Sequence, residues 1–258
     1  MAFRKEDYIA VFDSGLGGIS VLQHLRRIMP TERYLYFGDC ANAPYGTRST
    51  AQVRELTMAA VDHILGNYPV KALVVACNTA TAAAISHLRA LYPDLIVIGI
   101  EPALKLAADR FPGGNLGVMA TDVTLREEKF QKLWTTYAGG CQVYPISVPG
   151  LVELVEQGRE EGKEAETLLT PILSPYVGKL DALVLGCTHY PFASKAISGI
   201  LGDHTVLLDG GDGTARETRR RLALADLLAE PEQQGNIVLR SSGDDTQFQI
   251  LARRLLGE

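Results

Sequence analysis

Two cysteines stand in similar settings far apart in the chain, and both could do acid–base chemistry. Cys77 follows the apolar run of "VVACNTAT" and Cys187 follows that of "LVLGCTHYP", so each thiol comes where a strand is expected to end. A thiol has a pKa of about 8.5, so modest tuning makes either protonation state accessible at neutral pH. One thiolate could remove a proton from a carbon atom while the other thiol donates one to the opposite face. Such a pair would invert a stereocentre without a cofactor, although a single buried cysteine is more often simple packing.

Polar residues accompany both thiols. Asp13 ends the first apolar run, and we expect it to act near Cys77; His189 lies two residues after Cys187, and we expect it to act on that thiol. Hydroxyl and amide groups near the strand ends could bind the carboxylate and ammonium groups of a substrate, and these belong to Ser14, Asn78, Thr79, Thr121 and Thr188. Each of them could equally cap a helix.

The stretch "AVFDSGLGG" raises a different possibility, a site for a nucleotide. Its glycines, Gly15, Gly17 and Gly18, match a dinucleotide fingerprint in part, with Ser20 in place of the third glycine. Asp39 could then bind a ribose, but Asp13 at the strand tip would repel a pyrophosphate. We expect instead a tight turn with positive φ and close backbone approach, whose exposed amides hold a substrate carboxylate.

A second loop, "NAPYG", follows the next apolar run. It contains Pro44, Tyr45 and Gly46. Its backbone amides could hold another anionic group, and as a plain turn it would need no ligand. Both interpretations stay open at this point.

The elements that position these residues are predicted by short apolar runs alternating with helical segments. This alternation is typical of an α/β fold with largely parallel sheets flanked by helices. Eight strands are expected, at residues 9–12, 34–37, 72–76, 95–100, 116–120, 142–146, 182–185 and 206–208. Cys77 comes 64 residues after Asp13, and Cys187 comes 66 after Thr121. The near-equal spacing predicts two similar α/β domains, with the active site in the cleft between them and at the carboxyl ends of the strands.

Composition narrows the function classes. The 258 residues carry a net charge of −5, so no basic surplus favours nucleic-acid binding. The cysteines show no metal-ligand spacing, Cys40 and Cys141 have no counterpart in the other half, and we expect no metal site. The polar start of the chain resembles neither a signal peptide nor a transit peptide, and no apolar run approaches the roughly 20 residues that span a bilayer, so we expect a cytoplasmic protein.

Five motifs occur in order over nearly the whole chain: "VFDSGLGG", "GD" followed by "PYG", "ACNTAT", "GCTHYP" and "LLDGGDGTA". Together they resemble the cofactor-independent glutamate racemases of the aspartate/glutamate racemase family. The resemblance implies interconversion of L- and D-glutamate for peptidoglycan biosynthesis. It also implies that the final segment returns to the first domain, so that residues 1–98 with 208–258 form one domain and 99–207 the other.

The resemblance also implies roles for individual residues. Cys77 and Cys187 match the paired acid and base, with Asp13 and His189 as their helpers. Further positions match those that hold substrate: Asp13, Ser14, Pro44, Tyr45, Gly46, Asn78, Thr79, Thr121, Thr188 and His189. Glu153, in "PGLVELVE", resembles an acid of the family near the site, although an exposed helical glutamate would need no role.

Two alternatives remain beside glutamate racemisation. The first is racemisation of aspartate or another small acidic amino acid, because the two-thiol device would be the same and only the side-chain pocket would differ. The second, more remote, is a nucleotide-binding regulatory module that uses the glycine loop and Asp39. We expect a small-molecule substrate, no cofactor, no nucleic acid, no membrane and a homodimer.

Overall fold

The computed structural model describes residues 3–101, 103–121, 124–125, 134–136 and 140–258. Contacts within the chain divide it into two compact units. Unit 1 consists of residues 1–100 and 211–258, and unit 2 of residues 101–210. The chain therefore leaves unit 1 after its first hundred residues and returns to it for the last part.

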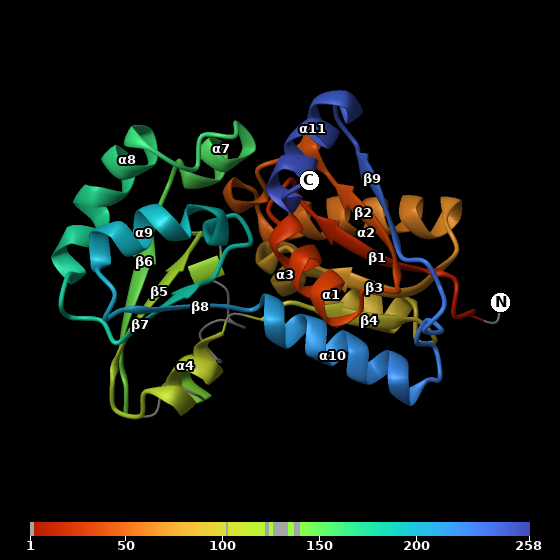
Figure 1. Ribbon diagram of the computed structural model, residues 1–258, viewed down its shortest axis with the longest axis horizontal. Helices are drawn as coiled ribbons and strands as arrows, with labels where there is room; N and C mark the ends of the chain where they lie inside the picture. Colours follow the sequence, from red (N-terminus) through yellow and green to blue (C-terminus); the bar gives the residue numbers. More distant parts are fainter. Residues whose placement is uncertain (1–2, 102, 122–123, 126–133, 137–139) are drawn as a thin grey trace. The chain divides into compact units, whose positions relative to one another are not determined.

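Unit 1 is built on a parallel sheet with the strand order β4-β3-β1-β2-β9 (Figure 1). Its strands are β1 (Tyr8–Asp13), β2 (Arg33–Gly38), β3 (Val70–Val75), β4 (Ile96–Gly99) and β9 (Asn236–Ser241). Its helices are α1 (Ile19–Ile28), α2 (Thr50–Asn67), α3 (Asn78–Leu91), α10 (Gly211–Leu224) and α11 (Asp245–Leu256), with short 3-10 turns η1 (Cys40–Asn42) and η2 (Tyr45–Thr47). The inner strands are buried along almost their whole length, as parallel strands covered on both faces must be.

Alternation along the strands of unit 1 separates two helical layers. Leu35 and Phe37 of β2 pack in the cluster that contains the apolar faces of α2 and α3. Tyr34 and Tyr36 point the other way, because successive strand side chains face opposite sides of a sheet. The Tyr34 hydroxyl donates to carbonyls at the end of α1, and Tyr36 stacks on Phe248 of α11. The sheet therefore lies between α2 and α3 on one face and α1, α10 and α11 on the other.

Unit 2 repeats the plan with the strand order β6-β5-β7-β8, again parallel. Its strands are β5 (Asn115–Ala120), β6 (Gln142–Ser147), β7 (Ala182–Leu185) and β8 (Val206–Asp209). The helices of unit 2 include α4 (Leu104–Arg110), α7 (Leu151–Glu156), α8 (Lys163–Leu173) and α9 (Ser194–Leu201), with 3-10 turns η3 (Ser174–Tyr176) and η4 (Tyr190–Ala193). Leu183 and Leu185 of β7 pack with α7, α8 and α9, whereas Ala182 and Val184 pack with α4.

The fold class predicted from the sequence is confirmed: the chain forms two parallel α/β domains with flanking helices. Eight of the strands lie where the apolar runs predict them, and the ninth, β9, is missing from that prediction. β9 forms the edge of its sheet, and only Leu239 of its six residues is fully buried, so its apolar signal is weak. The chain between β6 and β7 forms two helices, α7 and α8, and the turn that separates them contains Gly158 and Gly162, both with positive φ.

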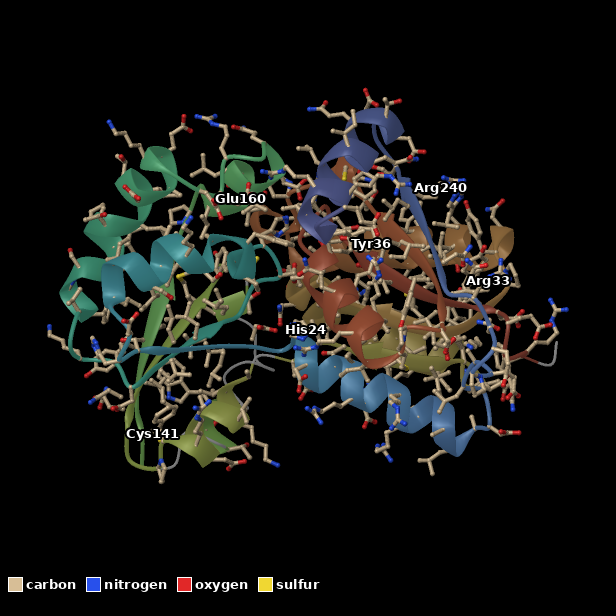
Figure 2. The ribbon with its side chains drawn as sticks, viewed as in Figure 1. His24, Arg33, Tyr36, Cys141, Glu160 and Arg240 are labelled. Atoms are coloured by element: carbon tan, nitrogen blue, oxygen red, sulfur yellow. The ribbon has the colours of Figure 1, made fainter. Side chains whose placement is uncertain are left out.

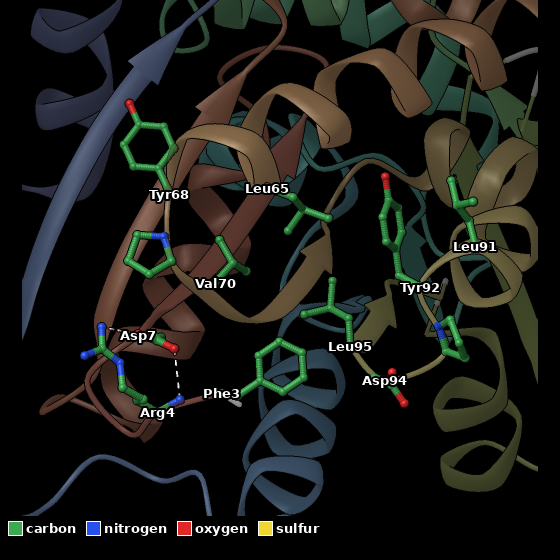
Figure 3. A pocket seen from close by; sticks show the side chains of 12 residues that line it. Phe3, Arg4, Asp7, Leu65, Tyr68, Val70, Leu91, Tyr92, Asp94 and Leu95 are labelled. Atoms are coloured by element: carbon green, nitrogen blue, oxygen red, sulfur yellow. Dashed lines mark hydrogen bonds and ion pairs between the residues drawn. The ribbon is translucent and has the colours of Figure 1, made fainter. Parts of the chain in front are cut away.

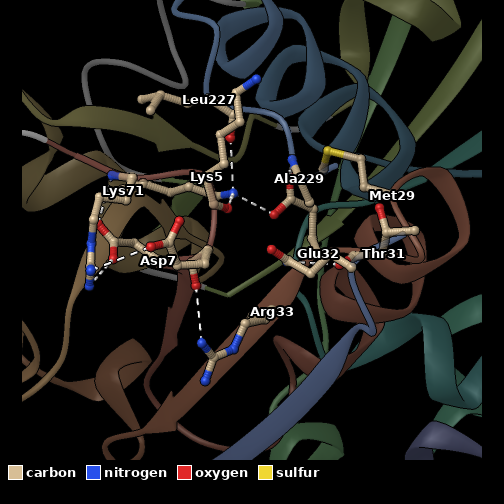
Figure 4. Close-up of polar contacts among 12 residues, drawn as sticks. Lys5, Asp7, Met29, Thr31, Glu32, Arg33, Lys71, Leu227 and Ala229 are labelled. Carbon is tan, nitrogen blue, oxygen red and sulfur yellow. Dashed lines mark hydrogen bonds and ion pairs between the residues drawn. The ribbon is translucent and has the colours of Figure 1, made fainter. Parts of the chain in front are cut away.

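A buried ion pair connects the segment after α10 to the rest of unit 1. Lys71 of β3 is fully buried, and its ammonium group lies 2.6 Å from the Glu32 carboxylate. It also donates to the carbonyls of Lys5 and, at 2.9 Å, Leu227, while the Ala229 amide donates to Glu32 at 2.9 Å (Figure 4). Burial lowers the pKa of Lys71, and the Glu32 carboxylate opposes that change. The cluster therefore joins the N-terminal segment, β3 and the segment after α10.

Candidate active site

The carboxyl ends of three neighbouring strands bring most of the predicted residues of unit 1 together. β1 lies between β2 and β3, and the Asp39 amide donates to the Asp13 carbonyl at 2.9 Å, just past the end of the β1–β2 ladder. On the other side, the Ala76 amide donates to the Phe12 carbonyl at 2.8 Å. Asp13, Asp39 and Cys77 thus leave the same edge of one sheet, where open α/β sheets bind ligands.

Cys77 lies at the N-terminal end of α3 as its N-cap residue. Its Sγ is 3.6 Å from the Ser14 hydroxyl and accepts a hydrogen bond from the Ala80 amide at 3.4 Å. The side chain is buried, with 6% of the residue exposed. The Ala80 amide and the helix dipole at this end favour negative charge on the sulfur. The surroundings of Cys77 can therefore stabilise its thiolate form.

The glycine loop brings Asp13 and α1 close together. Asp13 is fully buried and accepts a hydrogen bond from the Gly15 amide at 2.9 Å. The Tyr36 hydroxyl, labelled in Figure 2, donates to the Gly15 carbonyl at 2.7 Å. A Cβ at Gly18 would lie 2.7 Å from the Cβ of Asp13, so this position needs glycine for close approach. The expected positive φ is wrong here, because Gly18 has a φ of −63°.

Asp39, considered above as a ribose ligand, organises the neighbouring loop. Its carboxylate accepts from the Tyr45 hydroxyl at 2.7 Å, from the side-chain amide of Asn42 at 3.0 Å and from the Ser242 hydroxyl at 2.6 Å. Burial raises the pKa of Tyr45, and the hydrogen bond to Asp39 raises it further, so the phenol stays protonated and donates. Pro44 and Gly46 flank this buried tyrosine and are half-buried. With its oxygens so engaged, Asp39 offers little support for a nucleotide site.

Asn78 and Thr79 begin α3 directly after Cys77, and both are buried. Among the residues that the structure describes, Asn78 Oδ1 is a buried oxygen without a hydrogen-bond partner. A buried acceptor left in this state costs free energy, so it usually indicates a ligand or a water molecule. An ammonium group could provide the missing donor.

In unit 2 the second thiol belongs to a chain of three side chains. His189 Nδ1 lies 3.7 Å from Cys187 Sγ, and its Nε2 lies 2.6 Å from Oε1 of Glu156. Burial by itself lowers the pKa of His189, but the hydrogen bonds to Cys187 and Glu156 outweigh it and raise this pKa well above its ordinary value. A raised pKa favours the charged imidazole, which has one N–H for each of these two neighbours.

The remaining candidates of unit 2 have different surroundings. Thr121 follows β5, and its hydroxyl lies 3.0 Å from that of Thr124 and accepts from the Thr124 amide at 3.3 Å. Thr188 is buried between Cys187 and His189. Glu153, the acid singled out in the sequence, is exposed on α7. The acid that reaches His189 is Glu156, one turn further along the same helix, and the sequence alone could not show which glutamate faces inward.

Cys40 and Cys141 are both half-buried. The Cys141 thiol, labelled in Figure 2, lies just before β6 and donates to the Phe111 carbonyl at 3.4 Å. The described residues contain no cluster of three or more side chains suited to a metal ion. In the same part of the chain, no helix combines the length and apolar character needed to cross a bilayer.

A pocket of about 700 Å³ lies elsewhere in unit 1, at the amino ends of β1, β3 and β4. Figure 3 shows its mostly apolar lining, which includes Phe3, Tyr68 and Tyr92. Because parallel strands have all their carboxyl ends at one edge, this pocket lies at the edge of the sheet opposite to Asp13 and Cys77. It is therefore separate from the candidate active site.

Comparisons with known proteins agree on one family. Residues 18–218 match the model of the Asp/Glu/Hydantoin racemase family. The glutamate racemase of Clostridium perfringens is 42% identical over 253 residues, which cover 98% of this chain and 97% of that protein. Among solved structures, glutamate racemase isoform RacE1 of Bacillus anthracis has a TM-score of 0.88 at 32% identity and covers 99% of this chain and 96% of its own. The Escherichia coli glutamate racemase, solved with L-glutamate and the activator UDP-MurNAc-Ala, has a TM-score of 0.86 at 30% identity, covering 97% and 95%.

Proposed function

We propose that this chain, which belongs to the Asp/Glu/hydantoin racemase family and within it to the glutamate racemases, inverts Cα of glutamate with two thiols and no cofactor. The observation that carries the proposal is the matched setting of Cys77 and Cys187. Each is a buried thiol just past the third strand of its half, with a polar partner beside its sulfur. Paired acids and bases with different surroundings are what a two-base reaction requires.

The proposed step moves two protons and changes no oxidation state. One thiolate removes the Cα proton and becomes a thiol, which leaves a carbanion stabilised by the adjacent carboxylate. The other thiol then donates its proton to the opposite face of Cα and becomes a thiolate. After one turnover the protonation states of Cys77 and Cys187 are exchanged, and protons from solvent restore them.

The neighbours of each sulfur set its role in this scheme. The charged imidazole of His189 stabilises a thiolate on Cys187 and can return a proton to it, while Glu156 holds the imidazole in place. On the other side, the Ala80 amide and the N-terminal end of α3 stabilise a thiolate on Cys77. Asp13 lies at the neighbouring strand end, and we assign it as the helper of that thiol.

Substrate binding is assigned to the groups around Cys77 and Cys187. Asn78 Oδ1, which lacks a donor, is proposed to accept from the substrate ammonium group. Backbone amides of the glycine loop and of residues 45–46 are proposed to hold carboxylates, with hydroxyls supplying further hydrogen bonds. These hydroxyls belong to Ser14, Thr79, Thr121 and Thr188.

Exchange in D2O tests the mechanism directly. Incubation of the wild-type protein with L-glutamate should yield D-glutamate labelled at Cα, and aspartate should exchange far more slowly. Cys77→Ala and Cys187→Ala should each abolish inversion. Each variant keeps one of the two proposed catalytic thiols, so it should exchange the Cα proton of only one enantiomer, and the two variants should prefer opposite enantiomers.

Cys40→Ala and Cys141→Ala are the matched controls, because neither thiol lies in the two arrangements described above, and both should keep most of the activity. Inversion by either single variant of Cys77 or Cys187 would overturn the two-base mechanism. Exchange of the Cα proton of aspartate but not of glutamate would show that the substrate is aspartate and not glutamate. Calorimetric binding of NAD or ATP without any response to glutamate would favour the nucleotide-binding alternative.

We further propose that the enzyme works as a homodimer in the cytoplasm and supplies D-glutamate for peptidoglycan. The relatives support the substrate, since the Escherichia coli enzyme was solved with L-glutamate. Light scattering of the purified protein tests the dimer. Growth of a D-glutamate-requiring bacterium that expresses this chain, without added D-glutamate, tests the cellular role.

A further inference from the structure

The C-terminal segment reaches the candidate active site through a single turn. β9 pairs with β2 in parallel from Arg33↔Asn236 to Gly38↔Ser241. Because the register is in step, the residue after β9, Ser242, comes beside Asp39, the residue after β2. The Ser242 amide donates to the Gly38 carbonyl at 3.1 Å, which extends the ladder by one more bond.

The Ser242 hydroxyl both donates and accepts a hydrogen bond in this position. Its hydroxyl donates to Asp39 Oδ1 at 2.6 Å and accepts from the Ala41 amide at 3.1 Å. A Cβ at Gly243 would lie 3.5 Å from the Ala41 nitrogen, so the turn lies against the beginning of the loop that follows β2. We call residues 42–46, which include Tyr45, the substrate loop.

Asp39 connects that hydroxyl to the substrate loop. It is 3% exposed, and its carboxylate needs several donors because a buried charge is otherwise costly. The donors are Ser242, Asn42 and Tyr45, at 2.6, 3.0 and 2.7 Å. Two of the three belong to the substrate loop, and the third comes from about 200 residues further along the chain. The Asp39 carboxylate therefore connects the substrate loop both to the end of β2 and to the turn after β9.

We propose that Ser242 is a positioning residue, which acts through Asp39 to hold the substrate loop in the shape that binds substrate. This inference rests on the proposed function, because it assigns the amides of Tyr45 and Gly46 to a substrate carboxylate. Ser242 touches neither thiol arrangement directly, so its removal affects binding more than the proton transfers. Loss of one hydrogen bond to a charged group should raise the KM for glutamate about tenfold and leave kcat within about twofold.

The chain offers a matched control one residue away. The Ser241 hydroxyl accepts from the Gly243 amide at 3.0 Å in the same turn, instead of bonding to Asp39. Steady-state racemisation of L- and D-glutamate should show a raised KM in Ser242→Ala and ordinary values in Ser241→Ala. Ser242→Thr keeps a hydroxyl and should restore the KM. A mere loss of stability in Ser242→Ala would instead lower the folded fraction and the apparent kcat without raising the KM.

A double-mutant cycle tests the route through Asp39. Tyr45→Phe removes the phenol donor, so adding Ser242→Ala to it should raise the KM by much less than Ser242→Ala does in the wild type. An unchanged KM in Ser242→Ala, an equal rise in Ser241→Ala, or a loss confined to kcat would overturn the proposal. These outcomes are independent of the two-thiol mechanism, which fails only if Cys77→Ala or Cys187→Ala still inverts glutamate.

Discussion

Replacement of Glu156 by glutamine should weaken the charged state of His189 and with it the second thiol. Glu156 Oε1 lies 2.6 Å from His189 Nε2, and only 3% of the histidine side chain and 23% of the glutamate side chain are exposed. A hydrogen bond between charged groups contributes about 1.5–3 kcal/mol, and limited access of water favours the upper part of that range. We expect Glu156→Gln to lower the free energy of unfolding by about that amount near pH 6.

The pH dependence has a definite sign. Burial lowers the pKa of His189, but the hydrogen bonds to Cys187 and Glu156 raise it well above its ordinary value. A group with a raised pKa in the folded state stabilises the fold fully below its unfolded pKa, about 6.5, and this contribution is lost as the pH rises through the folded pKa. Without the charge of Glu156 the pKa of His189 falls, so the variant loses this stabilisation at a lower pH than the wild type.

Two measurements check this reasoning. Titration of the His189 imidazole by NMR should show a lower pKa in Glu156→Gln, and urea unfolding at several pH values should show the loss of stability. Glu153→Gln is the matched control, since it makes the same change on an exposed side chain of the same helix. An unaltered His189 titration in Glu156→Gln, or equal changes in both variants, would refute the assignment of Glu156.

Two further predictions concern unit 1. Lys71→Met leaves Glu32 buried without its cation and should lower the free energy of unfolding, measured in urea, by about 3–5 kcal/mol. The double variant Lys71→Met/Glu32→Gln should recover part of this loss. A decrease below about 1 kcal/mol in Lys71→Met would contradict the prediction. Gly18→Ala brings a Cβ within 2.7 Å of the Asp13 side chain, so it should lower the free energy of unfolding by about 1–3 kcal/mol and reduce kcat. In the control Gly66→Ala, in α2, the new Cβ meets nothing within 4 Å, so kcat should stay unchanged and the free energy of unfolding should stay unchanged or rise by up to about 1 kcal/mol. Similar behaviour of the two variants would count against the close approach at Gly18.

Local patterns were sufficient for most of the fold. Fully buried parallel strands produce continuous apolar runs, and for that reason the positions of β1, β3 and β7 could be predicted from the local sequence alone. β9 could not, because an edge strand is only partly buried and owes its conformation to pairing with β2, about 200 residues earlier. The same long-range pairing places Ser242 beside Asp39, which no local pattern indicates.

The sequence by itself determined which groups could do the chemistry, since Cys77, Cys187 and His189 follow apolar runs whose ends must lie at the binding edge of a parallel sheet. Only the tertiary structure decided which partners those groups have. Glu153 and Glu156 stand three residues apart on one helix, and the rotation of α7 against the sheet, set by the burial of Leu151 and Val155, turns the second toward His189. Asp39 likewise became a hydrogen-bond acceptor for Tyr45 and Ser242 through contacts between distant segments. Such contacts depend on the register of packed elements, and register is fixed by the whole core and not by the residues next to each site.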